Sequence, residues 1–174
     1  MCACSIGALI LAAMALYAGI YHLMRYLLMK EWREDLAFSL MCFCMVFYDV
    51  FSAGLYSADS PAEGAVWQQC QIAALCATGI CLLMFVSAFI RRKNRMWDYI
   101  FSSFWLFQIV MSFFGAEGWM WTDEPAVKHV RIFGHFMTYY EVEPGELASI
   151  GGLSMIAAFL YIIATLFRYG RAGE

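Results

Sequence analysis

Long apolar blocks are the feature that most constrains the fold of this chain. Of its 174 residues, 63% are hydrophobic and only 14% are charged, and most of the charges lie between the blocks. The blocks are Ile6–Met29, Leu36–Tyr56, Val66–Ile90, Trp97–Phe114 and Leu147–Phe167. Each is long enough for a helix to cross about 30 Å of hydrocarbon with every backbone group paired inside the helix. We therefore predict an all-α, polytopic transmembrane bundle of about five spans, forming a single domain over residues 1–174.

The first block is predicted to be a retained span. No basic residue precedes its apolar core, and that core is longer than the apolar region of a typical signal peptide.

Lysine and arginine are distributed unequally between the two sides of such a bundle. Those on one side are Arg25, Lys30, Arg33, Arg91, Arg92, Lys93, Arg95, Arg168 and Arg171. Only Lys128 and Arg131 fall on the other side. Because basic residues are enriched in cytoplasmic loops, the N-terminus is predicted outside and the C-terminus in the cytoplasm.

The outer segment between the fourth and fifth blocks, Gly115–Glu146, is unusually long and rich in aromatic residues. From Phe136 to Val142 its side chains alternate, with Tyr139 and Glu141 on one side and Tyr140 on the other. One interpretation is a β-hairpin over Lys128–Glu143, with Gly134 as its turn. The other is an aromatic segment that lies in the membrane interface. We also expect this segment to offer a binding surface formed by Trp119, Trp121, His135, Tyr139 and Tyr140.

Polar residues from three of the predicted spans share one depth, toward the outer side. They are Asp49, Gln68, Gln71, Gln108 and Ser112. A charge inside a membrane is costly and usually faces a polar neighbour or a cavity. One hypothesis is a water-accessible ligand pocket under the long outer segment. The alternative is a set of hydrogen bonds that holds the helices together and keeps Asp49 paired.

No residue pattern indicates a cofactor or a metal. The cysteines lack the spacing of a zinc site, and most of them lie in apolar blocks, where packing is their expected role. His22 is predicted near the inner end, whereas His129 and His135 are in the outer segment, so a bis-histidine haem is disfavoured. The sequence contains no phosphate-binding loop, zinc-protease motif or nucleophile elbow, and no basic stripe for nucleic acid. We therefore expect neither an enzyme nor a nucleic-acid-binding protein.

Several short runs carry a family resemblance. They are Glu34–Leu40, Phe47–Phe51, Gly54–Tyr56, Glu63–Gln68 and Gly134–Gly145. Together they resemble the N-terminal seven-helix sensor region of bacterial histidine kinases and diguanylate cyclases, over about Leu36–Gly170. The resemblance implies an outer N-terminus, a basic loop after the third helix and the bacterial inner membrane. The chain differs in having about five spans and no output domain before Glu174. We expect a truncated input module, a stand-alone relative or a subunit that borrows its output from a partner.

These observations lead to three functional hypotheses. The first is a non-enzymatic membrane sensor that passes an outer signal to the cytoplasm through a shift among helices. The second is an accessory subunit of a larger membrane complex, with the aromatic outer segment as its docking surface. The third is a small transporter or channel, which is disfavoured because the inner halves of the spans look largely apolar. The expected contacts are the lipid bilayer and a protein partner or further copies of the chain.

Overall fold

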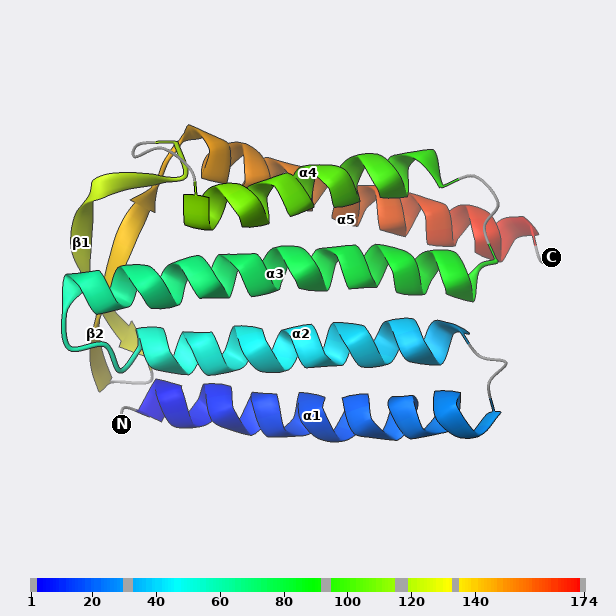
Figure 1. Ribbon diagram of the computed structural model, residues 1–174, viewed down its shortest axis with the longest axis horizontal. Helices are drawn as coiled ribbons and strands as arrows, with labels where there is room; N and C mark the ends of the chain where they lie inside the picture. The colour runs from blue at the N-terminus through cyan, green and yellow to red at the C-terminus, as the bar shows by residue number, and fades with distance from the viewer. Residues whose placement is uncertain (1–2, 30–32, 92–94, 115–118, 133–134, 173–174) are drawn as a thin grey trace.

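The computed structural model describes residues 3–29, 33–91, 95–114, 119–132 and 135–172. Its helices are α1 (Ala3–Met29), α2 (Arg33–Leu55), α3 (Pro61–Phe89), α4 (Met96–Phe114) and α5 (Glu146–Ala172). Two strands, β1 (Trp121–Ile132) and β2 (His135–Pro144), lie between α4 and α5. The helices lie side by side and alternate in direction, and the strands cover one end of the bundle (Figure 1). We call this the hairpin end, and the other the opposite end.

Four of the helices are long and apolar enough to cross a membrane. They are α1, α2, α3 and α5, and they support an integral, multi-pass membrane protein. The prediction of five spans is thus supported for four. The remaining helix, α4, has 19 residues and carries Asp98 and Gln108, both of which are buried. These two polar residues lower its average hydropathy, although its outward face carries exposed aromatic residues such as Phe114.

The third helix begins earlier than the apolar block it contains. The Glu63 backbone N–H donates to Ser60 Oγ at 3.2 Å, and the Asp59 N–H donates to Glu63 Oε2 at 3.0 Å. Pro61 occupies the first turn, where its missing N–H costs nothing. The bond to Ser60 is one half of a capping box, whereas Glu63 reaches back to Asp59, the residue before the cap. Together the two bonds place the start of α3 at Pro61 instead of Val66.

Two kinds of packing hold the helices together. Between α3, α4 and α5, the buried core includes Trp105, Leu83 and Ile162. Between α1 and α2 small residues allow close approach, and a Cβ added at Gly19 would lie only 3.1 Å from Cys42 Cβ. Side chains on the outer surface are largely apolar, as a helix bundle in lipid requires.

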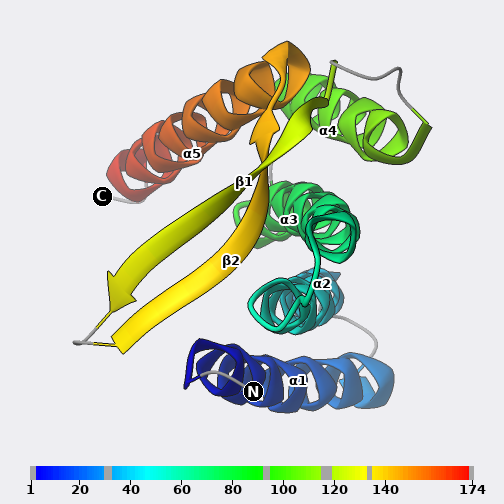
Figure 2. The ribbon, with the colours of Figure 1, turned by 90° about the vertical axis from the view of Figure 1, so that its left-hand side faces the viewer.

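The hairpin interpretation of the long outer segment is confirmed. The strands pair antiparallel from Pro125–Ile132 against His135–Val142, and Trp121 pairs with Pro144 after an irregularity in the register. The first strand therefore begins seven residues before the predicted Lys128. The predicted turn residue, Gly134, lies outside the described residues. From α4 and α5 the hairpin passes the end of α3 and then runs out beside α2 toward the side of α1 (Figure 2).

Candidate ligand site beneath the hairpin

A single glutamine of α3 holds the second strand of the hairpin. Gln68 Nε2 donates to the Val142 carbonyl oxygen at 2.9 Å, and the Val142 N–H donates to Gln68 Oε1 at 2.7 Å. Both residues are buried, with exposed fractions of 6% and 7%. The side-chain amide thus satisfies both backbone groups of one strand residue, as a neighbouring strand would do. We call this pair of hydrogen bonds the amide clamp.

One turn earlier on α3, a glycine lets the strand approach the helix. A Cβ at Gly64 would lie 2.8 Å from Tyr140 Cβ and 2.9 Å from the Tyr140 carbonyl oxygen. No side chain fits at such distances, so this close approach requires glycine. Gly64 and Gln68 are four residues apart and therefore share one helix face. That face forms the seat on which β2 rests.

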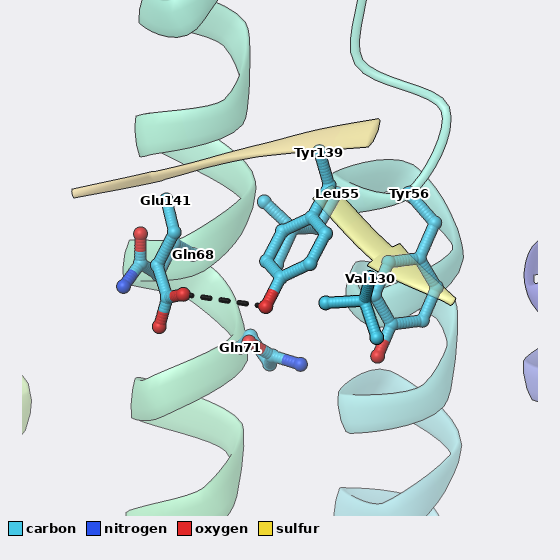
Figure 3. A pocket seen from close by; sticks show the side chains of 7 residues that line it. All are labelled: Leu55, Tyr56, Gln68, Gln71, Val130, Tyr139 and Glu141. Atoms are coloured by element: carbon cyan, nitrogen blue, oxygen red, sulfur yellow. Dashed lines mark hydrogen bonds between the residues drawn. The ribbon is translucent and has the colours of Figure 1, made fainter. Parts of the chain in front are cut away.

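A cavity of about 270 Å³ lies on one side of the amide clamp, between α2, α3 and the hairpin. Its lining residues are Leu55, Tyr56, Gln68, Gln71, Val130, Tyr139 and Glu141 (Figure 3). The rings of Tyr56 and Tyr139 meet edge to face at 5.9 Å, and Gln71 Nε2 donates to Ser52 Oγ at 2.7 Å. We call this the α2–α3 cavity. Two aliphatic residues line it together with two tyrosines, two amides and a carboxylate, so it is more polar than a usual small-molecule site.

Glu141 supplies the negative charge of this region. Its carboxylate lies 2.6 Å from Lys128 Nζ and accepts a hydrogen bond from the Tyr139 hydroxyl at 3.4 Å. The hydrogen bond to Glu141 raises the pKa of Lys128. The pKa of Tyr139 is also raised, first by partial burial of the phenol and then by the negative charge of Glu141. At neutral pH the phenol is therefore held protonated as a donor.

A second cavity, of about 200 Å³, lies on the other side of the amide clamp. Its polar lining residues are Gln68, Gln108, Trp121 and Glu141. The rest of the lining is Ile72, Leu75 and Cys76 from α3, Pro144 from β2, and Ala148, Gly151, Gly152 and Met155 from α5. We call this the α3–α5 cavity. Because Gln68 and Glu141 line both cavities, the two spaces adjoin the same clamp.

The second glutamine ties α4 to the start of α5. Gln108 Nε2 donates to the Leu147 carbonyl oxygen at 3.0 Å, and Cys76 Sγ lies 3.8 Å from Gln108 Oε1. Gly151 makes room for this amide, since a Cβ there would lie 1.9 Å from Gln108 Nε2. At the hairpin end, Gln68 of α3 thus binds the second strand, and Gln108 of α4 binds the first turn of α5.

The five polar residues predicted to share one pocket are distributed differently. Gln68, Gln71 and Gln108 line the two cavities, whereas Ser112 is buried and donates to the Gln108 carbonyl oxygen within α4. Asp49 is buried but lines neither cavity. It lies seven residues after Cys42, on the face of α2 that packs against Gly19 of α1. The rotation of α2 therefore directs it away from the glutamines.

The predicted outer-loop residues also differ in their positions. Trp119 is 60% exposed, and Tyr140 is partly buried above Gly64. Tyr139 lines the α2–α3 cavity, and Trp121 lines the α3–α5 cavity. The backbone of His135 pairs with Ile132, and its side chain lies outside what the structure describes.

Sequence reasoning did not select Glu141 as a binding residue. The signal was nevertheless present, because the alternating pattern placed Glu141 on the same side of the strand as Tyr139. Tyr56 was also missed, since it stands at the end of an apolar block and looks like an ordinary interface residue.

The opposite end holds buried charged groups that the apolar appearance of the inner halves did not predict. His22 Nδ1 of α1 lies 2.6 Å from Asp35 Oδ1 of α2, and Arg25 lies 3.6 Å from the same carboxylate. Asp35 is only 5% exposed. This cluster ties α1 to α2.

A second buried carboxylate at the opposite end joins three helices. Asp98 of α4 accepts hydrogen bonds from the Ser87 hydroxyl of α3 and from the Tyr161 hydroxyl of α5, the latter at 3.0 Å. Asp98 is 8% exposed. Together with the Asp35 cluster, it shows that the polar groups here pair with one another across helices.

Cysteines and histidines form no metal-binding cluster among the residues that the structure describes. His129 Nδ1 lies 2.9 Å from Thr138 Oγ1 across the hairpin. Cys44 and Cys81 are free thiols whose sulfur atoms lie 3.9 Å apart between α2 and α3.

Comparison of the chain with models of known protein families, with curated proteins and with solved structures gives no match.

Proposed function

We propose that this chain is a non-enzymatic membrane sensor or receptor-like module that binds its ligand beneath the hairpin. One observation carries the proposal: Gln68 holds the hairpin through Val142 and also lines both cavities. A ligand in either cavity contacts the residue that positions the hairpin. Ligand binding and hairpin position are therefore linked through one side chain.

The proposed topology has five spans, with the hairpin end outside. The α3 helix ends at the opposite end, and the hairpin that follows α4 lies at the hairpin end (Figure 1). The chain must therefore return across the bundle through α4, whose exposed face is apolar. The basic residues Arg91, Arg95 and Arg168 lie toward the opposite end, which supports a cytoplasmic position for it.

Signal transfer requires that the ligand favour one of two arrangements of the helices. The α3 helix is the natural carrier, because it holds the amide clamp at one end and Ser87 at the other. Small helix shifts of about 1–2 Å are a known means of such transfer. The resemblance of the sequence to the sensor regions of bacterial histidine kinases supports the same interpretation, and on that resemblance we propose a bacterial inner-membrane location.

The test is to remove the amide clamp and to measure the distance between α3 and α5 at the opposite end of the bundle. Non-cysteine spin labels at Arg91 and Arg168 would report the distance between α3 and α5 in lipid nanodiscs. Gln68→Leu should change that distance or broaden its distribution, whereas Gln69→Leu, at a residue that lines neither cavity, should not. Identical distance distributions for wild type and Gln68→Leu would contradict the sensor proposal.

The second candidate is an accessory subunit of a membrane complex. It is favoured by an exposed aromatic group at the hairpin end, where Phe114 is 85% and Trp119 60% exposed. Exposed aromatic area of this kind suits a protein interface. A mild-detergent pull-down from the native membrane, followed by mass spectrometry, separates the two. A stoichiometric set of further subunits would favour the accessory subunit over the autonomous sensor.

A further inference from the structure

We propose that the α3–α5 cavity binds a neutral single-chain amphiphile, such as a long-chain alcohol or amide, taken from the lipid bilayer. The chain of the ligand would lie between α3 and α5, and its polar head would lie beside Trp121 and Glu141. This inference rests on the proposed function and deepens it by naming a ligand class.

An unpaired hydrogen-bond donor marks the polar side of the cavity. Trp121 Nε1 is buried and has no hydrogen-bond partner among the residues that the structure describes. Buried polar groups almost always have a partner, and an indole N–H can only donate. Trp121 lines the α3–α5 cavity, so a ligand oxygen in this space would accept a hydrogen bond from its indole N–H.

The remaining walls favour a hydrocarbon chain. Apolar side chains from both helices line it, Ile72 and Leu75 from α3 and Ala148 and Met155 from α5. Gly152 also lines it, is exposed at the surface, and would place an added Cβ in open space. Since α3 and α5 are both candidate spans, the side chains below the hairpin are those that a lipid tail would meet.

Charge selects the kind of head group. The carboxylate of Glu141 lines the same cavity, and the exposed acidic residues Glu143 and Glu146 lie near it in sequence. Among the side chains that the structure describes, the basic group paired with Glu141 is Lys128, at 2.6 Å. An anionic head would meet repulsion here, whereas a hydroxyl or amide donates to Glu141 and accepts from Trp121. A neutral head with both functions therefore fits best.

The direct test is photolabelling of the full chain in phosphatidylcholine nanodiscs. The probe is dodecanol with a diazirine in its chain and a terminal alkyne, and the matched probe carries a sulfonate in place of the hydroxyl. Peptide mass spectrometry should find saturable labelling by the alcohol at Ile72–Cys76 and Ala148–Met155, competed by plain dodecanol. The sulfonate should label these segments much less.

Two variants test the binding mode. Trp121→Phe keeps the ring but removes the N–H, and should weaken competition by about 3- to 10-fold, the value of one hydrogen bond. Trp119→Phe, at an exposed position, is its control. Gly152→Leu should fill the cavity and remove the saturable labelling. Gly170→Leu, a change in the same helix that also meets open space, should leave it intact.

The outcomes distinguish failure of the ligand-site proposal from failure of the sensor proposal. Labelling that is unsaturable, or equal for both probes, would overturn the amphiphile site. Equal labelling in wild type and Gly152→Leu would also overturn it. If labelling behaves as expected but dodecanol leaves the distance between Arg91 and Arg168 unchanged, the site stands and the sensor proposal fails. If Gln68→Leu changes that distance while labelling is absent, the sensor proposal stands and this ligand class fails.

Discussion

The two ends of the helix bundle are held together by different chemistry. At the hairpin end, the neutral amides Gln68 and Gln108 bind backbone groups, and two cavities adjoin them. At the opposite end, the carboxylates Asp35 and Asp98 bind side chains from neighbouring helices. Gln68 and Gln108 thus hold a strand and the start of a helix by their backbones, whereas Asp35 and Asp98 join helix to helix through side chains.

This difference indicates where the molecule can change shape. A neutral amide that binds a strand through two ordinary hydrogen bonds can release it at modest cost. A buried carboxylate that loses its partners is left unsatisfied in a medium of low polarity, which costs much more. We therefore expect the hairpin end to adapt and the opposite end to hold the helices in place.

The largest effect is expected at Gly151, which lies against the buried side-chain amide of Gln108. In Gly151→Leu the new side chain would displace Gln108, whose Nε2 would lie 1.9 Å from the added Cβ. Overpacking of this kind should lower the free energy of unfolding by about 3 kcal/mol. Thermal unfolding in detergent measures it. Gly152→Leu, where a Cβ meets nothing within 4 Å, is the matched control, and equal losses in the two variants would contradict the packing.

The next effect tests whether Asp98 holds the opposite end. Asp98→Ala leaves the hydroxyls of Ser87 and Tyr161 without their acceptor, which should cost about 2 kcal/mol. Asp98→Asn keeps a side chain that can accept one bond and donate another, so its loss should be smaller. Thermal unfolding of the two variants gives the comparison. An Asp98→Ala protein as stable as the wild type would remove the proposed contrast between the ends.

A more local effect is expected from the amide clamp. Gln68→Leu removes two hydrogen bonds to Val142 and should raise amide hydrogen exchange in residues 138–144 by roughly tenfold. Exchange in the core around Trp105 and Leu83 should remain close to that of the wild type. Gln69→Leu is the control on the same turn. Uniform acceleration over the whole chain would mean that the hairpin and the bundle open as one unit.

The smallest effect is alkaline weakening of the hairpin. The pKa values of Lys128 and Tyr139 are both raised in the folded protein, so the folded state binds their protons more tightly than the unfolded state. Their contribution is complete below the ordinary values of 10.5 and 10.0, and is lost as the pH rises past them. The melting temperature should fall slightly above about pH 10. In Lys128→Met the melting temperature should fall less over this pH range. A wild-type melting temperature that does not fall above pH 10 would exclude a contribution from Lys128 and Tyr139.

The sequence predicted the helices well and their mutual rotation poorly. Apolar blocks of spanning length need no tertiary information, and the hairpin could be recognised from the alternation around Tyr139. Three glutamines, Gln68, Gln69 and Gln71, lie within one turn of α3, yet only the first binds Val142. Asp49 was grouped with them by its position in the span, yet it lies on the face of α2 that packs against Gly19 of α1. The sequence pattern predicts where a residue lies along its span, whereas helix packing decides which neighbour its side chain faces.

Sequence alone determined that this chain forms apolar helices joined by short basic loops on one side and a long aromatic segment on the other. The reason is that the bilayer imposes length and hydropathy on each span independently. Only the tertiary structure decided that Gln68 holds the hairpin, that Glu141 lines both cavities and that the opposite end is tied by Asp35 and Asp98. Those contacts join residues that are far apart in the chain, and they depend on how helices and strand approach one another in space.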